Sequence, residues 1–138
     1  MTNDQMMQVL QKCPLFAGMS TLSIDLALGN ISYQIINFAP RDVYTLAGMP
    51  CRFADIVLSG SLICRMVSLS GKQVEVTRLR PGNLIAPAFI FAKNNSMPVS
   101  VETDSEVTLL RMTPQTLKKL IDDDADIRMN YIRSLSNI

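Results

Sequence analysis

Residues 80–101 (RPGNLIAPAFIFAKNNSMPVSV) hold the residue pattern of this chain that is best suited to ligand chemistry. A Pro-Gly turn ends an alternating segment, and an apolar run at 86–91 and a polar loop at 93–96 follow it. The apolar run predicts one short helix, and the segment from Pro98 predicts a return strand. Together these elements form a concave insertion in a sheet, with backbone N–H groups and a helix N-terminus at its mouth. The pattern therefore predicts a pocket that can accept an anion.

Groups that support catalysis or metal binding are few. The sequence has no histidine, which removes the usual imidazole metal ligand, the serine–histidine nucleophile pair and the most common general base. Its three cysteines, Cys13, Cys51 and Cys64, are too far apart for a zinc pattern or a disulfide framework. Reduced thiols are the interpretation that we adopt, and a redox-sensing thiol or a cluster ligand is the alternative. We expect no catalytic residue, no metal, no cofactor and no enzyme activity.

An acidic run near the C-terminus resembles a metal site on paper. It consists of Asp122, Asp123, Asp124 and Asp126. Because these carboxylates lack the glycine spacing of a calcium loop, we expect a junction between two helices, with aspartates at the N-terminus of the second.

Composition limits the protein to a few classes. Its 138 residues predict one domain, and a hydrophobic fraction of 48% can fill a core. Thirteen basic and twelve acidic residues, without a strongly basic stretch, argue against a nucleic-acid-binding surface. The sequence contains no apolar run long enough for a membrane span, and its N-terminus lacks the pattern of a signal peptide. We expect a cytoplasmic protein without membrane contact.

Helical signals lie at both ends of the chain. Thr2 or Asn3 can cap a first helix, Ser20 a second, and Thr113 a third that starts at Pro114. The apolar positions expected in these three helices are Met6, Met7, Val9 and Leu10, then Leu22, Leu26 and Leu28, then Leu117, Leu120 and Ile121.

A last helix is expected from about residue 125. It places Ile127, Tyr131, Ser134 and Ile138 on one side, which predicts the start of a two-helix seam between copies of the chain.

Between the helices the apolar period changes to two. The pattern predicts strands near residues 33–38, 43–46, 54–58, 62–69, 73–79, 99–103 and 107–112. Short strands separated by frequent turns are typical of an all-β sandwich or barrel.

The motifs CPLFAGMS, GMP, VLSGSL, SGK, RPGNL and TPQTLKKLI occur in this order, with glycines at 48, 60, 71 and 82 where strands turn. This order resembles the N-terminal cyclic nucleotide-binding domain of the cyclic-AMP receptor protein/FNR family of bacterial transcription regulators. The resemblance covers the whole chain. It implies a mainly β fold with flanking helices, a double-stranded β-helix barrel of the jelly-roll or cupin-like type.

In that family the pocket carries a Gly-Glu pair for the ribose, and an arginine followed by Ser or Thr and Ala for the cyclic phosphate. These positions read Ala86-Pro87 and Met97-Pro98-Val99 here, so both polar anchors are absent. Loss of the arginine removes a charge-assisted hydrogen bond of about 1.5–3 kcal/mol. The resemblance implies a degenerate, apolar ligand pocket formed by Gly82, Leu84, Ile85, Ala86, Pro87, Phe89, Met97, Pro98 and Val99. We expect no response to cyclic AMP.

Family members carry a winged helix-turn-helix after the long helix, and residues 1–138 do not contain one. We therefore expect an effector-sensing domain, with residues from about 125 to 138 starting a dimerisation helix. We expect an unidentified small-molecule effector, DNA contact through a C-terminal domain outside this chain, and a homodimer of the full-length protein. The first alternative is a stand-alone degenerate module that acts as a dimerisation or interaction scaffold. The second is an enzyme on a similar barrel, which would need metal ligands or a catalytic set.

Overall fold

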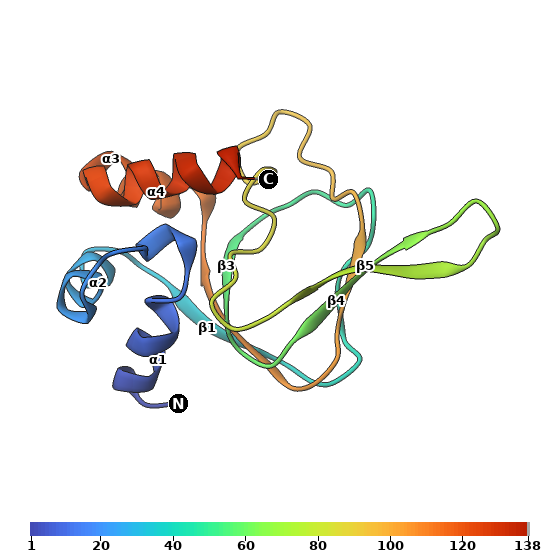
Figure 1. Ribbon diagram of the computed structural model, residues 1–138, viewed down its shortest axis with the longest axis horizontal. Coiled ribbons are helices and arrows are strands. Elements are labelled where there is room, and N and C mark those ends of the chain that lie inside the picture. The colour runs from blue at the N-terminus through green and yellow to red at the C-terminus, as the bar shows by residue number, and fades with distance from the viewer. Residues whose placement is uncertain (138) are drawn as a thin grey trace.

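Two antiparallel sheets form the body of the molecule, with the helices gathered at one end (Figure 1). The computed structural model describes residues 1–137 of the chain. One sheet has the order β1-β7-β3 and the other the order β2-β6-β4-β5. The strands are β1 Gln34–Phe38, β2 Val43–Thr45, β3 Ala54–Ser59, β4 Leu62–Val67, β5 Gln73–Leu79, β6 Ser100–Thr103 and β7 Val107–Met112. The hairpin of β4 and β5 projects from the end of the molecule opposite the helices (Figure 1).

The helices begin at the predicted capping residues. Their bounds are α1 Asn3–Leu10, the 3₁₀-helix η1 Pro14–Phe16, α2 Thr21–Leu28, α3 Pro114–Asp123 and α4 Ala125–Ser136. The side chains of Thr2, Ser20 and Thr113 accept the predicted backbone hydrogen bonds at the starts of α1, α2 and α3. No helix in the described part of the chain has the length and apolar character needed to cross a membrane.

The acidic run is a helix junction, as predicted. The carboxylate of Asp124 accepts hydrogen bonds from the backbone N–H groups of Asp126 and Ile127. A negative side chain at this position also interacts favourably with the N-terminal end of the α4 dipole.

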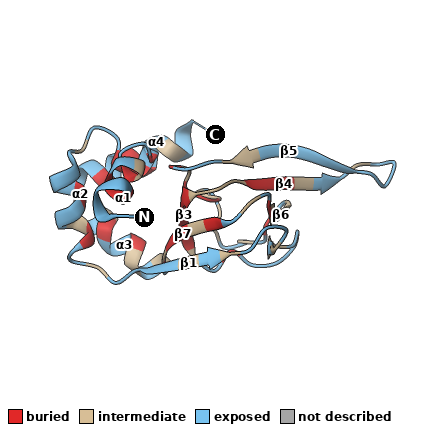
Figure 2. Ribbon diagram, turned by 90° about the horizontal axis from the view of Figure 1, so that it is seen from below, coloured by how far each residue is buried: buried red, intermediate tan, exposed pale blue. Residues whose placement is uncertain are grey.

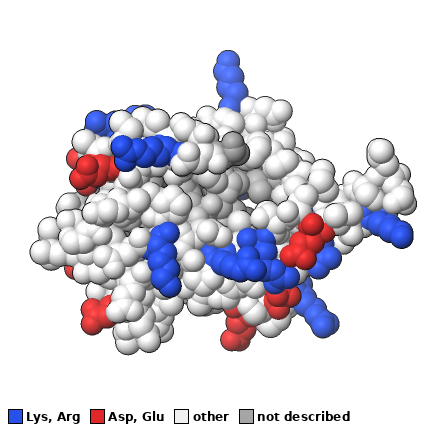
Figure 3. Space-filling view, viewed as in Figure 1, with Lys and Arg blue, Asp and Glu red and all other residues white. Residues whose placement is uncertain are grey.

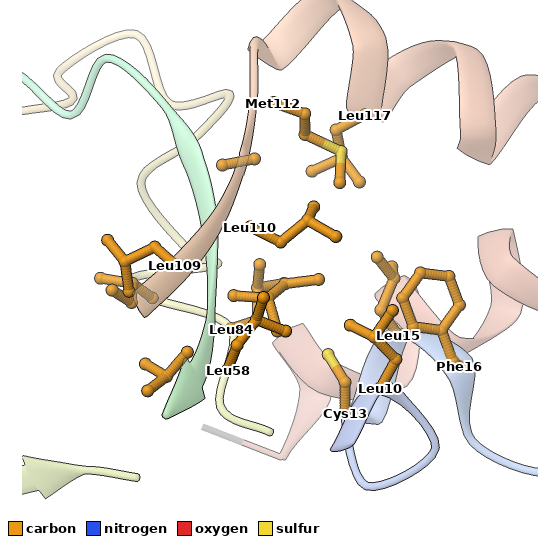
Figure 4. Close-up of a cluster of buried hydrophobic side chains, with 14 of the residues drawn as sticks. Leu10, Cys13, Leu15, Phe16, Leu58, Leu84, Leu109, Leu110, Met112 and Leu117 are labelled. Atoms are coloured by element: carbon orange, nitrogen blue, oxygen red, sulfur yellow. The ribbon is translucent and has the colours of Figure 1, made fainter. Parts of the chain in front are cut away.

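The core extends on both sides of the sheet that contains β3 and β7, toward the helices and toward β4 and β6 of the other sheet. Figure 4 shows side chains from the N-terminal segment, from β7 and from α3 meeting in it. Most residues of β3 and β7 are buried, whereas β1 and β5 are largely exposed (Figure 2). A charged residue within β3 or β7 therefore needs a partner inside the protein.

The segment after the Pro-Gly turn covers the free edge of β3. The backbone N–H groups of Gly82 and Ile85 donate to the carbonyl oxygens of Val57 and Asp55, and the N–H of Val57 donates to the carbonyl of Asn83. We call residues 82–91 the pocket segment. Because three backbone hydrogen bonds fix its first half to β3, the position of the segment is set by the sheet.

Two sequence-based expectations are wrong here. Residues 86–91 do not form a helix but two successive turns, in which the N–H of Phe89 donates to Ala86 and that of Ala92 to Phe89. Ala86 has φ +50°, in the left-handed region, and this conformation interrupts a right-handed helix. The predicted helix N-terminus for anion binding is therefore absent from this segment.

The predicted apolar face of α2 is also corrected. Leu22 and Leu26 are 67% and 63% exposed, while Ile24 and Leu28 are buried. The two buried residues are four positions apart and therefore share one side of the helix. Of these two, only Leu28 was among the predicted apolar positions.

Candidate functional site

A cavity of about 310 Å³ lies where β1, β2 and β7 meet the loop after β2. Its lining residues are Phe38, Tyr44, Thr45, Met49, Pro50, Cys51, Arg52, Phe53, Ile85, Met97 and Arg111. Aromatic and apolar side chains predominate, and two arginines supply positive charge. Ligand sites usually have this composition, an apolar wall with a few polar groups.

Arg111, which lines the cavity, forms an ion pair with a buried carboxylate behind it. Asp55 of β3 and Arg111 of β7 are directly opposite each other in the antiparallel ladder. The Arg111 Nε and Nη2 atoms donate to the two carboxylate oxygens of Asp55 at 2.9 and 3.0 Å. Asp55 is 0% exposed, so its carboxylate needs hydrogen-bonding partners inside the protein, and Arg111 supplies two of them with bidentate geometry.

Two aromatic residues complete the surroundings of this pair. The Tyr44 hydroxyl donates to Oδ2 of Asp55, and the guanidinium carbon of Arg111 lies 3.9 Å from the centre of the Phe53 ring. Burial, and then the adjacent Asp55 carboxylate, raises the pKa of Tyr44 above its ordinary value. Tyr44 therefore stays a neutral hydrogen-bond donor. Asp55 holds one edge of the Arg111 guanidinium, and the Phe53 ring lies against one of its faces.

The structure brings only part of the predicted pocket to this cavity. Of the nine predicted residues, Ile85 and Met97 line it. The other seven lie elsewhere. Leu84 is buried in the core, and Gly82 lies against Lys12. Pro98 is exposed in a surface hollow beside Met66, and four residues are half-buried: Ala86, Pro87, Phe89 and Val99.

The sequence reasoning missed Tyr44, Asp55 and Arg111. A signal existed, because Asp55 and Arg111 are single charges within the otherwise apolar strands ADIVL and VTLLRM. Both strands were predicted, but the period of a strand does not say which strand pairs with which. Because Asp55 and Arg111 are 56 positions apart, no local pattern indicates that they pair.

The pocket segment contacts α4 through one tyrosine. The Tyr131 hydroxyl donates to the carbonyl oxygen of Pro87 at 2.6 Å. The rings of Tyr131 and Phe91 pack edge to face, with centroids 5.8 Å apart. Asn130 of α4 also donates to the carbonyl oxygens of Leu15 and Ala17. These contacts fix α4 to the pocket segment on one side and to the N-terminal segment on the other.

The same contacts correct the predicted helix seam. Ile127 and Tyr131 are 0% and 6% exposed against their own chain, so they present no surface to a second copy. The Ser134 hydroxyl donates to the Asn130 carbonyl within the helix, and Ile138 lies outside the described residues. The exposed apolar side chains of α4 are Met129, Ile132 and Leu135, at 45%, 47% and 39%. We call these three residues the outer stripe.

The three cysteines are free and buried. Burial raises the pKa of each thiol, that of Cys13 to about 12. A redox-sensing thiol needs a lowered pKa and access to solvent, and these thiols have the opposite environment. Within residues 1–137, no three His, Cys, Asp or Glu side chains are grouped so that they could hold a metal ion.

Comparison with known proteins identifies the family and the fold of this chain. Residues 35–124 match the family model described as the cyclic nucleotide-binding domain. Comparison with curated protein sequences gave no significant match.

Solved structures with a similar fold include a catabolite activator protein and domains of two transcriptional regulators. The catabolite activator protein of Thermus thermophilus superposes with a TM-score of 0.78 at 21% identity, over 90% of this chain and 57% of that one. The sensor domain of the regulator DNR from Pseudomonas aeruginosa gives 0.76 at 17%, over 98% and 89%. The N-terminal domain of a regulator from Streptomyces coelicolor A3(2) gives 0.75 at 20%, over 94% and 88%. The predicted fold, mainly β with flanking helices and of the jelly-roll type, is confirmed.

Proposed function

This chain belongs to the cyclic nucleotide-binding domain family, and we propose that it is the effector-sensing domain of a cytoplasmic bacterial transcription regulator of the Crp/Fnr type. In this proposal residues 1–138 bind a small molecule and have no catalytic role. DNA contact belongs to a C-terminal domain outside this chain, and the full-length protein is a homodimer. On the face drawn in Figure 3, basic and acidic side chains are interspersed, which supports a role other than direct DNA binding for this domain.

The observation that carries the proposal is the contact between the pocket segment and α4. Ile85 lines the cavity, and Pro87 and Phe91, two and six residues later, both contact Tyr131. A ligand that displaces Ile85 therefore changes the contacts of α4. Such a ligand shifts the position of α4 to the extent that it binds one arrangement more tightly than the other.

Three features support an effector other than cyclic AMP. Pro87 occupies the position of the family's acidic residue, and its carbonyl oxygen is already used by Tyr131. Met97 occupies the position of the arginine and is 5% exposed. Its backbone N–H and carbonyl are both hydrogen-bonded, to Met49 and Gly48, so this segment offers no free donor to a phosphate at that residue.

The experiment that tests the proposal is amide hydrogen exchange of α4. Tyr131→Phe removes the hydrogen bond to Pro87, and Phe91→Ala removes the ring contact, so both variants should lower the protection of α4 amides. Tyr33→Phe is the matched control, because Tyr33 is 36% exposed and lies before β1. Unchanged α4 protection in both variants would show that the pocket segment does not influence the helix, and the sensing proposal would then be wrong.

One observation favours the scaffold alternative. The side chains of Leu84, Ile85 and Met97 are buried and belong to the continuous core, so part of the predicted pocket is filled by the protein itself. A scaffold needs no ligand. The cavity beside Arg111 would then bind no small molecule, and this difference separates the two functions.

A further inference from the structure

We propose that the cavity beside Arg111 binds a small organic carboxylate with an aromatic or other apolar body, held by the guanidinium edge that Asp55 leaves free. The inference rests on the proposed sensing function and gives the chemical class of the effector. The anion anchor of this chain is then Arg111 of β7, and it takes over a role that Met97 lacks.

Arg111 has hydrogen-bond donors that Asp55 does not use. A guanidinium group has five N–H donors. Asp55 accepts from Nε and from Nη2. Within the described residues, Nη1 of Arg111 has no hydrogen-bond partner. This atom is also not fully buried. Since Arg111 lines the cavity, its Nη1 donors are available to a ligand there.

The side chain of Arg111 is already held in place. Its Nε edge is fixed by Asp55, and one face lies over the Phe53 ring at 3.9 Å. Asp55 in turn accepts a hydrogen bond from Tyr44. A guanidinium with a fixed position loses little side-chain entropy when a carboxylate binds, which increases affinity for a given contact.

The charge of the cavity also favours an anionic ligand. The two arginines of the lining, Arg52 and Arg111, and the buried carboxylate of Asp55 leave one net positive charge at the cavity. A monoanion neutralises this charge, whereas a dianion leaves an excess negative charge near Asp55. The site therefore favours a ligand with one carboxylate.

The walls of the cavity suit a small apolar body. Apart from the arginines, the side chains around the cavity are mostly apolar or aromatic, including Phe38, Met49 and Met97. A volume of about 310 Å³ is near the lower end of the range for ligand pockets, roughly 300–1,000 Å³. These dimensions suit a body of about one aromatic ring.

The probe for the test is benzoate, with benzamide as its neutral counterpart of the same shape. The readout is NMR of protein labelled with ¹³C at the methionine methyl groups. Met49 and Met97 report on the cavity, and Met129 reports on the outer stripe of α4. Benzoate is expected to shift the Met49 and Met97 signals in a saturable way and to bind at least about tenfold more tightly than benzamide, as one charge-assisted hydrogen bond provides. Equal affinity for the two probes, or no saturable shift at Met49 and Met97, would overturn the inference.

Two variants identify the anchor. The double variant Asp55→Asn with Arg111→Gln removes both charges together, and it should lose the preference for benzoate. Arg52→Gln removes the second positive charge of the lining but leaves the Nη1 donors of Arg111, so it should reduce the preference for benzoate without abolishing it. If Arg52→Gln abolishes the preference instead, Arg52 is the anchor and the inference fails. The decision stands even if the double variant does not fold, because the two probes and Arg52→Gln are measured on folded protein.

The same titration separates this inference from the proposed function. Shifts at Met49 and Met97 without any change at Met129 would support the ligand class and contradict the coupling to α4. Absence of shifts at Met49 and Met97 would contradict the ligand class, while the exchange experiment on Tyr131 would still decide the sensing proposal.

Discussion

The hydroxyl group of Tyr131 lies 2.6 Å from the carbonyl oxygen of Pro87 and donates a hydrogen bond to it. One residue of the last helix is thereby bonded to the segment that borders the cavity. Pro87 lies in the first of two consecutive turns, and Tyr131 also packs against Phe91 in the second. A change at the cavity and a change at α4 are therefore linked through contacts at both ends of a five-residue stretch.

The ion pair in the cavity wall should dominate the response of stability to mutation there. Arg111→Met leaves the carboxylate of Asp55 buried without a charged partner and should cost about 3–5 kcal/mol of unfolding free energy. The double variant Asp55→Asn with Arg111→Met removes both charges and should recover most of this loss. Urea unfolding followed by circular dichroism measures both. Equal destabilisation in the single and double variants would mean that packing, and not the charge, determines the loss.

Gly60 should tolerate no side chain. Its φ is +80°, and a Cβ at this position would lie 2.0 Å from the carbonyl oxygen of Glu106. Gly71→Ala is the matched control, because Gly71 has φ +83° and no atom within 4 Å of the added Cβ. The control should cost only the backbone strain, about 1–2 kcal/mol. Gly60→Ala should cost several kcal/mol more in thermal or urea unfolding, and similar losses in the two variants would contradict the close approach to Glu106.

Stability should fall as the solution becomes alkaline. Burial raises the pKa of Cys13 from 9.0 to about 12, and burial and Asp55 raise that of Tyr44. Above about pH 9 the unfolded chain releases protons that the folded chain retains, so the unfolding free energy decreases with pH. Each such group contributes up to about 1.4 kcal/mol per pH unit.

Urea unfolding between pH 7.5 and 10.5 measures this slope. Cys13→Ala should make it shallower, whatever its effect on stability at neutral pH. A slope that Cys13→Ala leaves unchanged would show that the Cys13 thiol does not stay protonated in the folded state.

The outer stripe of α4 provides the revised test of dimerisation. Ile132 is 47% exposed and Ile127 is 0% exposed on the same helix. Ile132→Asp should weaken self-association of the full-length protein, measured by sedimentation velocity, with its unfolding free energy changed by less than about 0.5 kcal/mol. Ile127→Asp should instead unfold the domain, since it buries an unpaired charge. A dimer unaffected by Ile132→Asp would place the contact on another surface.

The sequence predicted the elements of this fold better than the contacts between them. A period of two in the apolar residues predicts β5 and β7. Hydroxyl side chains at helix starts predict the caps Thr2, Ser20 and Thr113. These signals are complete within a few residues, so no tertiary information was needed.

The errors arose where tertiary contacts determine the structure. The left-handed Ala86 interrupts a helix that its apolar neighbours would favour. Apolar residues occur on two sides of α4, and only contact with η1 and Pro87 decides that Ile127 and Tyr131 face inward. The register of β3 against β7 likewise joins Asp55 to Arg111, and no local pattern encodes that pairing.

This member of a cyclic nucleotide-binding family is proposed to sense another small molecule. Calorimetric titration of the domain with cyclic AMP and with cyclic GMP tests it most directly, because Pro87 and Met97 replace the acidic and basic anchors of the family. We predict dissociation constants weaker than about 1 mM for both nucleotides. A dissociation constant of about 10 μM or tighter for either one would contradict the claim.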